Sequence, residues 1–531
     1  MSDADRLIAL LEEKLRPLET ALAEAWWETS TRATPEAAAR RERIELERRE
    51  LLGDPDAFGA IEAARRKADQ FEPIVARQLD VLHDAFVPHQ VDADLRRRIV
   101  ELEVDVETTF NTFRGEIDGQ RVDDNAIADV LRTDDDSATR RAAWEASKQV
   151  GAEVADRVRA LARLRNEAAR RLGYRDHFAL ALATGELDGQ RLFATLDEVD
   201  RATDAPFVEW KARLDADLAA RFGCDPGDLR PWHLDDPFFQ DPPVRGAVDL
   251  DPFFEHADVE ALTVRSYDGL GLDTRPVLAR SDLYAREGKS QHAFCIHVDR
   301  EGDVRVLCNV EPNERWTETM LHEFGHAVYD RELDSSLPWL LREPAHALTT
   351  EGVAMLFGRL ARDPRWLTSV AGVDAADVGA LTDRLAEARR AALLVFARWV
   401  LVMTNFERGL YADPDADHDT RWWDLVERYQ RVRRPDGREA PDWAAKIHLT
   451  VAPVYYQNYL YGELFASQLQ ATLDTRTGGL VDVPEAGRML VDEVFRPGGS
   501  LRWDRLVERA TGEPLTAAHL AHAALSPKRG V

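Results

Sequence analysis

The sequence predicts a mostly α-helical fold, and three observations support this prediction. Apolar residues recur at helical spacing through most of the 531 residues. Alternation of apolar and polar residues, which is typical of strands, is confined to one short stretch. No repeat of fixed period and no Ser/Gly-rich linker divides the chain. We therefore expect one domain that spans residues 1–531.

Charged amphipathic helices are expected over residues 5 to about 115 and again over 123–182. Apolar positions at helical spacing in these two blocks include Leu7, Leu10, Leu11, Leu15, Trp144, Val150, Val154 and Leu161. Four prolines then predict an irregular loop at 229–243. The next long helix, at 382–411, is apolar nearly all round between 391 and 403, which predicts that this part is buried.

The strand-like stretch, residues 292–310, predicts a β-hairpin. Apolar residues alternate on both sides of a polar turn at 300–303. The free edge of such a strand can pair with an extended peptide. A hairpin that only caps the helical core fits the pattern equally well. The metal site predicted below favours the first interpretation.

The segment after this hairpin predicts a helix over residues 314–330. Asn313 is a favourable N-cap, and Glu314 suits the positive end of the helix dipole. The apolar stripe of this helix consists of Trp316, Met320, Phe324 and Ala327. One side of the helix can therefore pack into the core while the other faces a cavity.

Two histidines on the polar side of this helix predict a zinc site. His322 and His326 are four residues apart, so both imidazoles lie on one face and can bind one ion. Glu323 lies beside them as a candidate general base. With 14 His in 531 residues, the pattern H-E-x-x-H arises by chance on the order of 0.1 times or fewer. The alternative is a solvated helix face without a metal.

A third zinc ligand has to come from another element. Glu332 is too close to His326 for the chain to turn back, and Glu343 precedes a proline at a non-helical junction. Glu351 follows two threonines that suit an N-cap, and it begins the apolar pattern of a second helix. We therefore predict Glu351 as the ligand, against the alternative of an ordinary acid in a first helical turn.

The formal net charge of −28 argues against nucleic acid and anionic membranes as partners, because their phosphates would repel this surface. Acidic residues follow Met1 where a signal peptide would have positive charge, so we expect a cytoplasmic protein. Cys224, Cys295 and Cys308 make no disulfide framework and lack metal-type spacing, so we expect thiols.

Taken together, these motifs resemble the angiotensin-converting-enzyme family of zinc peptidyl-dipeptidases and, more distantly, the thimet-oligopeptidase family. The resemblance rests on His322-Glu323-Phe324-Gly325-His326, Glu351, Trp422-Trp423, Lys446-Ile447-His448, Tyr456 and Tyr459. Both are families with the H-E-x-x-H…E ligand pattern. The resemblance implies two helical halves around a deep substrate channel, with a small β-hairpin beside the zinc helix and residues 1–115 as a helical lid.

The resemblance also implies the metal chemistry. One zinc ion would be bound by His322, His326 and Glu351, and Glu323 would activate the attacking water. His448 and Tyr459 would stabilise the oxyanion of the tetrahedral intermediate.

Substrate contacts are implied in the same way. His292 and the backbone of Ala293 would contact the peptide near the scissile carbonyl. Lys446 and Tyr456 would bind the terminal carboxylate of the substrate.

The sequence departs from the converting enzymes at several positions. Leu234 stands where those enzymes have a glutamine beside the carboxylate-binding lysine and tyrosine. Their chloride-site arginines are replaced by Val426 and Asn458. Met355 stands where an aspartate would orient a zinc histidine.

We therefore expect a zinc metallopeptidase that hydrolyses short peptides and releases C-terminal dipeptides, as a monomer or homodimer. The alternatives are an oligoendopeptidase or a single-residue metallocarboxypeptidase of a related helical fold. A catalytically inactive peptide-binding protein is the alternative from a different class.

Overall fold

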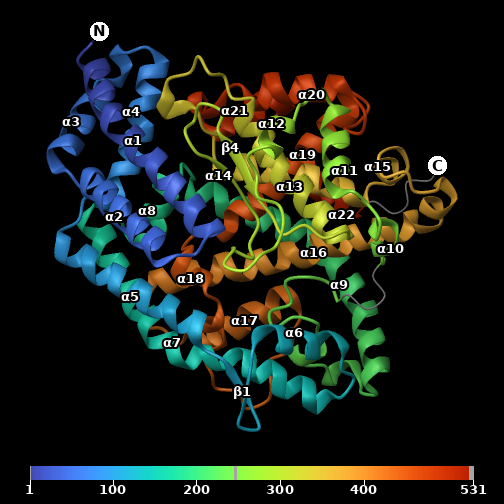
Figure 1. Cartoon of the computed structure of the whole chain (residues 1–531). Helices are drawn as coiled ribbons and strands as arrows, with labels where there is room; N and C mark the ends of the chain where they lie inside the picture. Colours follow the sequence, from blue (N-terminus) through green and yellow to red (C-terminus); the bar gives the residue numbers. More distant parts are fainter. Residues whose placement is uncertain (1, 244–247, 526–531) are drawn as a thin grey trace. The chain divides into compact units, whose positions relative to one another are not determined.

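The computed structural model describes residues 2–243 and 248–525, and it confirms the mostly α-helical fold (Figure 1). Within these residues the only sheets are two antiparallel pairs of strands, β1–β2 and β3–β4. The described chain contains no helix with both the length and the apolar character that a membrane span requires. Contacts between Cα atoms divide the chain into two compact units.

The first unit comprises the described residues of Met1–Gln90, Asp249–Thr382 and Tyr461–His519. Its helices and strands are α1 (Asp3–Thr31), α2 (Pro35–Leu52), α3 (Pro55–Arg65), η1 (Ala68–Gln70), α4 (Pro73–Phe86), η2 (Val87–His89), α10 (Asp251–Phe254), α11 (Val259–Asp268), α12 (Arg275–Leu278), β3 (Phe294–His297), β4 (Val304–Leu307), α13 (Glu314–Arg331), η5 (Trp339–Leu341), α14 (Ala347–Gly358), η6 (Arg359–Arg362), α15 (Pro364–Ser369), α20 (Pro484–Leu490), the π-helical turn η8 (Val491–Phe495), η9 (Gly498–Ser500) and α21 (Trp503–Thr511).

The second unit comprises the described residues of Val91–Val248, Asp383–Leu460 and Leu520–Val531. Its elements are α5 (Ala93–Thr112), β1 (Gly115–Ile117), β2 (Gln120–Val122), α6 (Asp124–Thr133), α7 (Ser137–Arg171), α8 (His177–Thr184), α9 (Gly189–Phe222), η3 (Pro226–Asp228), η4 (Pro231–His233), α17 (His418–Gln430), η7 (Asp442–Ala445) and α18 (His448–Val451). Three helices have residues in both units, namely α16 (Ala375–Ala412), α19 (Tyr456–Arg476) and α22 (Ala518–Leu525).

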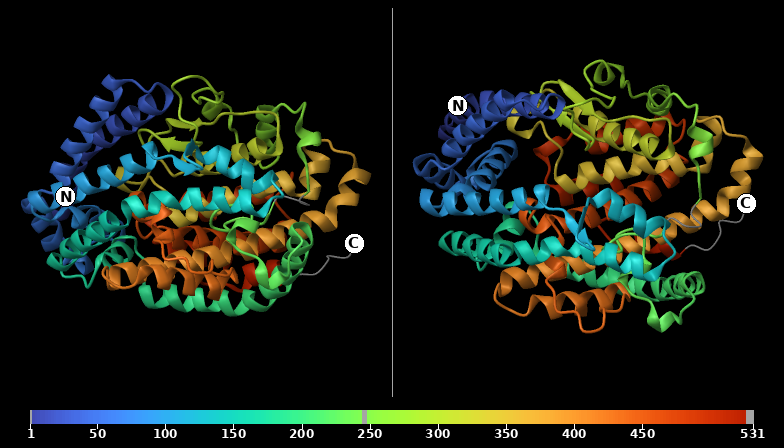
Figure 2. Two further views of the ribbon diagram at one scale, coloured as in Figure 1. Left: turned by 90° about the horizontal axis from the view of Figure 1, so that it is seen from below. Right: turned by 60° about the horizontal axis from the view of Figure 1, so that its bottom comes forward.

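In the first unit, helices α1 to α4 pack together, as the blue ribbons of Figure 2 show. Pro35, Pro55 and Pro73 open α2, α3 and α4, where the missing N–H of proline costs no helical hydrogen bond. The buried apolar residues that these helices share include Ile8, Leu11, Leu79, Leu82 and Phe86. Helices α1 to α4 therefore form a helical layer whose core they share with Trp339 and Leu340 of η5.

In the second unit, α7 is the central helix, and it lies beside α5 (Figure 2). The predicted irregular loop at 229–243 contains one 3₁₀ turn, η4, and no other helix or strand, as its prolines require. The apolar centre of α16 is buried, as predicted, and Arg398 is buried with it.

The β1–β2 hairpin of the second unit was not predicted, although its turn has a clear signal. Asp118 and Gly119 both adopt positive φ angles, of 50° and 77°, which two-residue hairpin turns require. The strands are three residues each, too short to show an alternating pattern. The Asp-Gly pair was therefore the only usable evidence in the sequence.

Candidate functional site

Helix α13 begins and ends within one residue of the predicted range. The side chain of Asn313 accepts a hydrogen bond from the Trp316 amide at 2.8 Å, which is the expected N-cap. Of the predicted apolar stripe, Met320, Phe324 and Ala327 are fully buried and pack into the core, whereas Trp316 in the first turn is only partly buried. The helix is thereby fixed with its histidine-bearing face away from that core.

Close contact between helices brings the next element over α13. A Cβ added to Gly325 would lie 2.9 Å from the Cα of Ala354, so only glycine permits α14 to approach this closely. A Cβ added to Gly462 would lie 3.1 Å from the Cβ of Glu351, which shows that α19 supports α14 from behind. These glycines set the position of Glu351.

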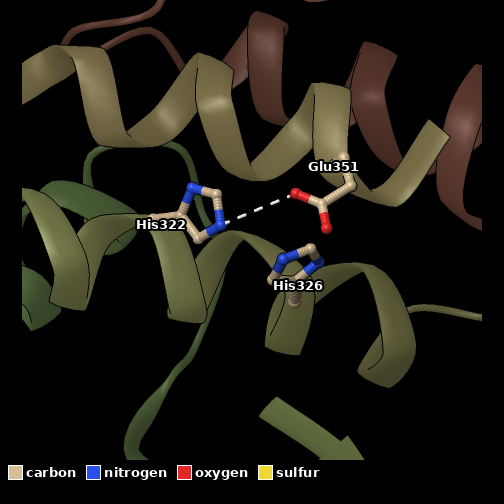
Figure 3. Close-up of side chains that lie close together, drawn as sticks. All are labelled: His322, His326 and Glu351. Atoms are coloured by element: carbon tan, nitrogen blue, oxygen red, sulfur yellow. Dashed lines mark ion pairs between the residues drawn. The ribbon is translucent and has the colours of Figure 1, made fainter. Parts of the chain in front are cut away.

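His322, His326 and Glu351 converge as the sequence predicted (Figure 3). One potential ligand atom from each residue lies within 4.8 Å of the other two. The Nε2 atom of His322 lies 3.9 Å from a carboxylate oxygen of Glu351. The centroids of the two imidazole rings are 5.0 Å apart, as expected for side chains one helical turn apart.

Thr350 orients one of these histidines. Its hydroxyl lies 2.6 Å from Nδ1 of His326, which leaves Nε2 of that ring for a metal. Met355 stands where the resemblance predicted an aspartate that orients a zinc histidine, and the sequence alone did not reveal which residue takes over that role. The sequence also assigned Thr350 to the N-cap, but α14 begins earlier, with His346 as its N-cap. The hydroxyl is therefore free to contact the imidazole instead.

Burial sets the protonation of this site. It lowers the pKa of His322 to about 4, and burial with the charge of His322 lowers the pKa of His326 to about 3. Both imidazoles are therefore neutral, which is the form that binds a metal. Glu323 is 8% exposed, and burial together with the charge of Glu351 raises its pKa to about 8. The hydrogen bond from the Cys295 backbone acts in the opposite direction and lowers this pKa.

The β3–β4 hairpin lies beside α13, as predicted. Cys295 faces this helix, because its Sγ lies 4.0 Å from the carboxylate of Asp330. Phe294 points to the opposite face, where its ring lies 6.2 Å from each of the rings of Trp26 and Trp27. Within the described chain, β3 pairs with no strand other than β4.

The residues expected to contact the substrate near the scissile bond lie just before β3. His292 is exposed, and Ala293 is partly buried. The rejected metal ligand Glu343 lies elsewhere in this unit, paired with Arg300 at 2.6 Å. The three cysteines are free thiols. Burial and nearby carboxylates raise the pKa of Cys295 well above its usual value, so this thiol is unreactive.

The second unit brings together the other four predicted residues, Lys446, His448, Tyr456 and Tyr459. The rings of His448 and Tyr456 are 5.0 Å apart, and those of Tyr456 and Tyr459 are 5.7 Å apart. The Nζ of Lys446 lies 5.8 Å from the centroid of the Tyr456 ring. These residues therefore form one cluster.

Gln240 is a member of this cluster that the sequence did not identify. Its Oε1 accepts a hydrogen bond from Nζ of Lys446 at 2.7 Å. The sequence comparison pointed to Leu234 for a glutamine, but Leu234 is a buried core residue. Gln240 and Lys446 are 206 positions apart. No local pattern could connect them.

Burial also governs the charges of this cluster. It lowers the pKa of Lys446 to about 8, while Asp236 and Asp241 oppose the shift. Burial and the charge of Lys446 lower the pKa of His448 to about 4, so this imidazole is neutral. Its Nδ1 is buried and has no hydrogen-bond partner among the residues that the structure describes.

The model of peptidase family M3 matches residues 255–524, just over half of the chain. The chain belongs to peptidase family M3. The protein is therefore a zinc metallopeptidase that uses one zinc ion, and its His-His-Glu group suits that ion. The match supports the thimet-oligopeptidase side of the resemblance and gives no support to the angiotensin-converting-enzyme family. Among curated proteins, none matches this sequence.

Proposed function

We propose that this M3 peptidase hydrolyses short peptides with a zinc ion bound by His322, His326 and Glu351. The observation that supports this proposal is the convergence of these three side chains from α13 and α14, with Glu323 on the same helix. The donor set suits the metal, because two neutral imidazoles and one carboxylate are ligands that catalytic zinc prefers. Three protein ligands leave a coordination position open for substrate or water.

Glu323 acts as the general base. When bound, zinc polarises the scissile carbonyl and lowers the pKa of water towards 7. The carboxylate of Glu323 takes a proton from the water whose oxygen attacks the carbonyl carbon. It then gives this proton to the amide nitrogen as the C–N bond breaks. Because Glu323 is buried, a proton that it takes from the attacking water stays within the site until it is given to the amide nitrogen.

His448 and Tyr459 supply hydrogen-bond donors to the oxyanion that forms on the carbonyl oxygen. Their proximity to Tyr456 within the second unit supports a shared role. A hydroxyl that donates mainly in the transition state raises kcat more than it lowers KM.

The peptide binds as an extended strand along β3, with His292 and the Ala293 backbone near the scissile carbonyl. Its terminal carboxylate is recognised by Lys446 and Tyr456, together with Gln240. Gln240 accepts from Lys446 through Oε1, so its amide N–H groups remain to donate to a carboxylate. On this recognition of the terminal carboxylate we base the proposal that C-terminal dipeptides are released in preference to internal cleavage.

We place the enzyme in the cytoplasm and treat residues 1–531 as one catalytic domain with a helical lid at 1–115. It acts as a monomer or homodimer.

Zinc content tests the ligand assignment. Purified protein should contain about one zinc per chain, and Glu351→Gln should lose most of it. Glu343→Gln is the matched control, because Glu343 is an acid of the same unit that pairs with Arg300. Full zinc in Glu351→Gln, with loss in Glu343→Gln, would show that the third ligand is wrong.

A further inference from the structure

The backbone segment 447–455 of the second unit, here called the histidine segment, lies between Lys446 and α19. Its only regular part is the four-residue helix α18, which begins at His448. Val454 adopts a φ of 55°, a left-handed conformation that a β-branched residue rarely takes. Secondary structure alone therefore does not fix the shape of this segment, and other contacts have to hold it.

Arg165 of α7 holds the first half of the histidine segment. Its guanidinium donates to the carbonyl oxygens of Leu449 and Thr450, at 3.0 and 2.6 Å. It also donates to the Tyr411 hydroxyl at 3.0 Å and to Glu103 at 2.6 Å. The planar guanidinium can bond several acceptors in a fixed geometry, which an ammonium group cannot do. Arg165 is only 4% exposed, so these bonds are shielded from water.

Glu407 of α16 holds the second half. Its Oε1 accepts a hydrogen bond from the Val454 amide at 2.8 Å, and the side chain is fully enclosed. On the other side of the same residue, the Gln457 side chain donates to the Val454 carbonyl at 2.5 Å. Both polar backbone groups of Val454 are thus bonded, and the left-handed conformation is maintained.

Burying an arginine and an ionisable carboxyl group is costly, and apolar residues of similar size often give equal or greater stability. Fold stability therefore gives a weak reason for having Arg165 and Glu407 here. Their bonds end on the backbone that leads into His448 on one side and into Tyr456 and Tyr459 on the other. A fixed backbone at this place is what transition-state donors require, because a 1 Å displacement can cost about a hundredfold in rate.

We propose that Arg165 and Glu407 are positioning residues that fix the histidine segment and thereby place His448, Tyr456 and Tyr459 for the reaction. This inference rests on the roles proposed above for His448 and Tyr459.

The test compares two substitutions at Glu407. Glu407→Met removes the acceptor at similar size and should lower kcat about ten- to a hundredfold, while KM and zinc content stay near wild type. Glu407→Gln keeps an acceptor oxygen for the Val454 amide and should restore most of the activity. Unchanged kcat in Glu407→Met would overturn the inference.

A control separates positioning from stability. Arg398 lies on the same helix, is also fully buried, and bonds Asp200 and Thr203 of α9 instead of the histidine segment. Arg398→Met should lower the unfolding temperature without changing kcat per bound zinc. An equal loss of kcat in Arg398→Met and Glu407→Met would show that both residues are only structural, which also overturns the inference.

Two further variants sharpen the result. Val454→Gly removes the strain of the left-handed conformation, so it should recover part of the kcat that Glu407→Met loses. Arg165→Lys keeps the positive charge, but a single ammonium group cannot donate to all the acceptors that the planar guanidinium reaches. This variant should lower kcat at constant KM, and it tests the inference even if Glu407→Met does not fold. Tyr459→Phe is measured in parallel. If Tyr459→Phe keeps full activity, the proposed function is refuted. If Tyr459→Phe loses activity while Glu407→Met keeps the wild-type kcat, only the inference about positioning is refuted.

Discussion

The metal-ligand region of the first unit and the histidine segment of the second unit are built in opposite ways. His322, His326 and Glu351 lie on two regular helices that glycines bring into contact, and Thr350 orients one imidazole. The histidine segment is mostly irregular and is held through its backbone. The enzyme therefore fixes the side chains of the first region by helix packing, and those of the second by hydrogen bonds between the backbone and the buried side chains of Arg165 and Glu407.

The largest expected effect lies in the first region. Glu323→Gln should retain zinc and peptide affinity but lower kcat by roughly 10³- to 10⁴-fold, because it removes the general base and not a ligand. Steady-state kinetics and zinc content measure both. Glu332→Gln, at the end of the same helix, is the control and should remain active. Near-normal turnover of Glu323→Gln would exclude this residue as the base.

The second prediction moves to the other region. Tyr459→Phe should lower kcat on the order of a hundredfold with little change in KM, because a donor to the oxyanion acts mainly in the transition state. Tyr455→Phe is the matched control, since its ring lies 5.0 Å from that of Tyr459. If Tyr455→Phe were the more damaging change, Tyr455 and not Tyr459 would be the donor to the oxyanion.

The third prediction concerns the substrate terminus. Amidating the C-terminus of a peptide should cost about 1.5 to 3 kcal/mol in kcat/KM, roughly ten- to a hundredfold, and Lys446→Ala should erase this preference. Lys211→Ala removes another buried lysine of the same unit, one paired with Asp215, and should keep the preference. Equal cleavage of free and amidated peptides by the wild type would identify an oligopeptidase that ignores the terminus.

The two regions also differ in how far the sequence could predict them. The helix of the first region has a local N-cap, a local apolar stripe and a four-residue histidine spacing, so its range and its ligand-bearing face follow from neighbouring residues. Glu351 was found because its helix begins soon after α13 ends, although its true N-cap is His346. Local chemistry was sufficient there.

In the second region the decisive contacts are distant in sequence. Gln240 meets Lys446 across 206 positions, and Arg165 meets Thr450 across 285. The resemblance assigned His448 and Tyr459 to the oxyanion and Tyr456 to the terminal carboxylate of the substrate, and the structure brings the three rings together. It could not supply the residues that hold this group, because arginine and glutamate inside a helical pattern look like ordinary surface residues until the packing is known.

The last expected effect is on stability and not on catalysis, and it is a pH dependence that originates at Glu407, beneath the histidine segment. Burial raises the pKa of Glu407 to about 8, although the Val454 hydrogen bond and the charge of Arg165 each lower it. The folded protein therefore keeps this proton between about pH 4.5 and 8, while the unfolded chain releases it. Because the unfolded state binds fewer protons in this window, the contribution of Glu407 to stability falls as pH rises. Each pKa unit corresponds to about 1.4 kcal/mol, so the loss of unfolding free energy amounts to at most a few kcal/mol.

Glu407→Gln has no such proton, and its unfolding free energy should decline less than that of the wild type between pH 5 and 8. Denaturant unfolding at several pH values measures the difference, and parallel curves for the two proteins would show that Glu407 is ionised in the folded state.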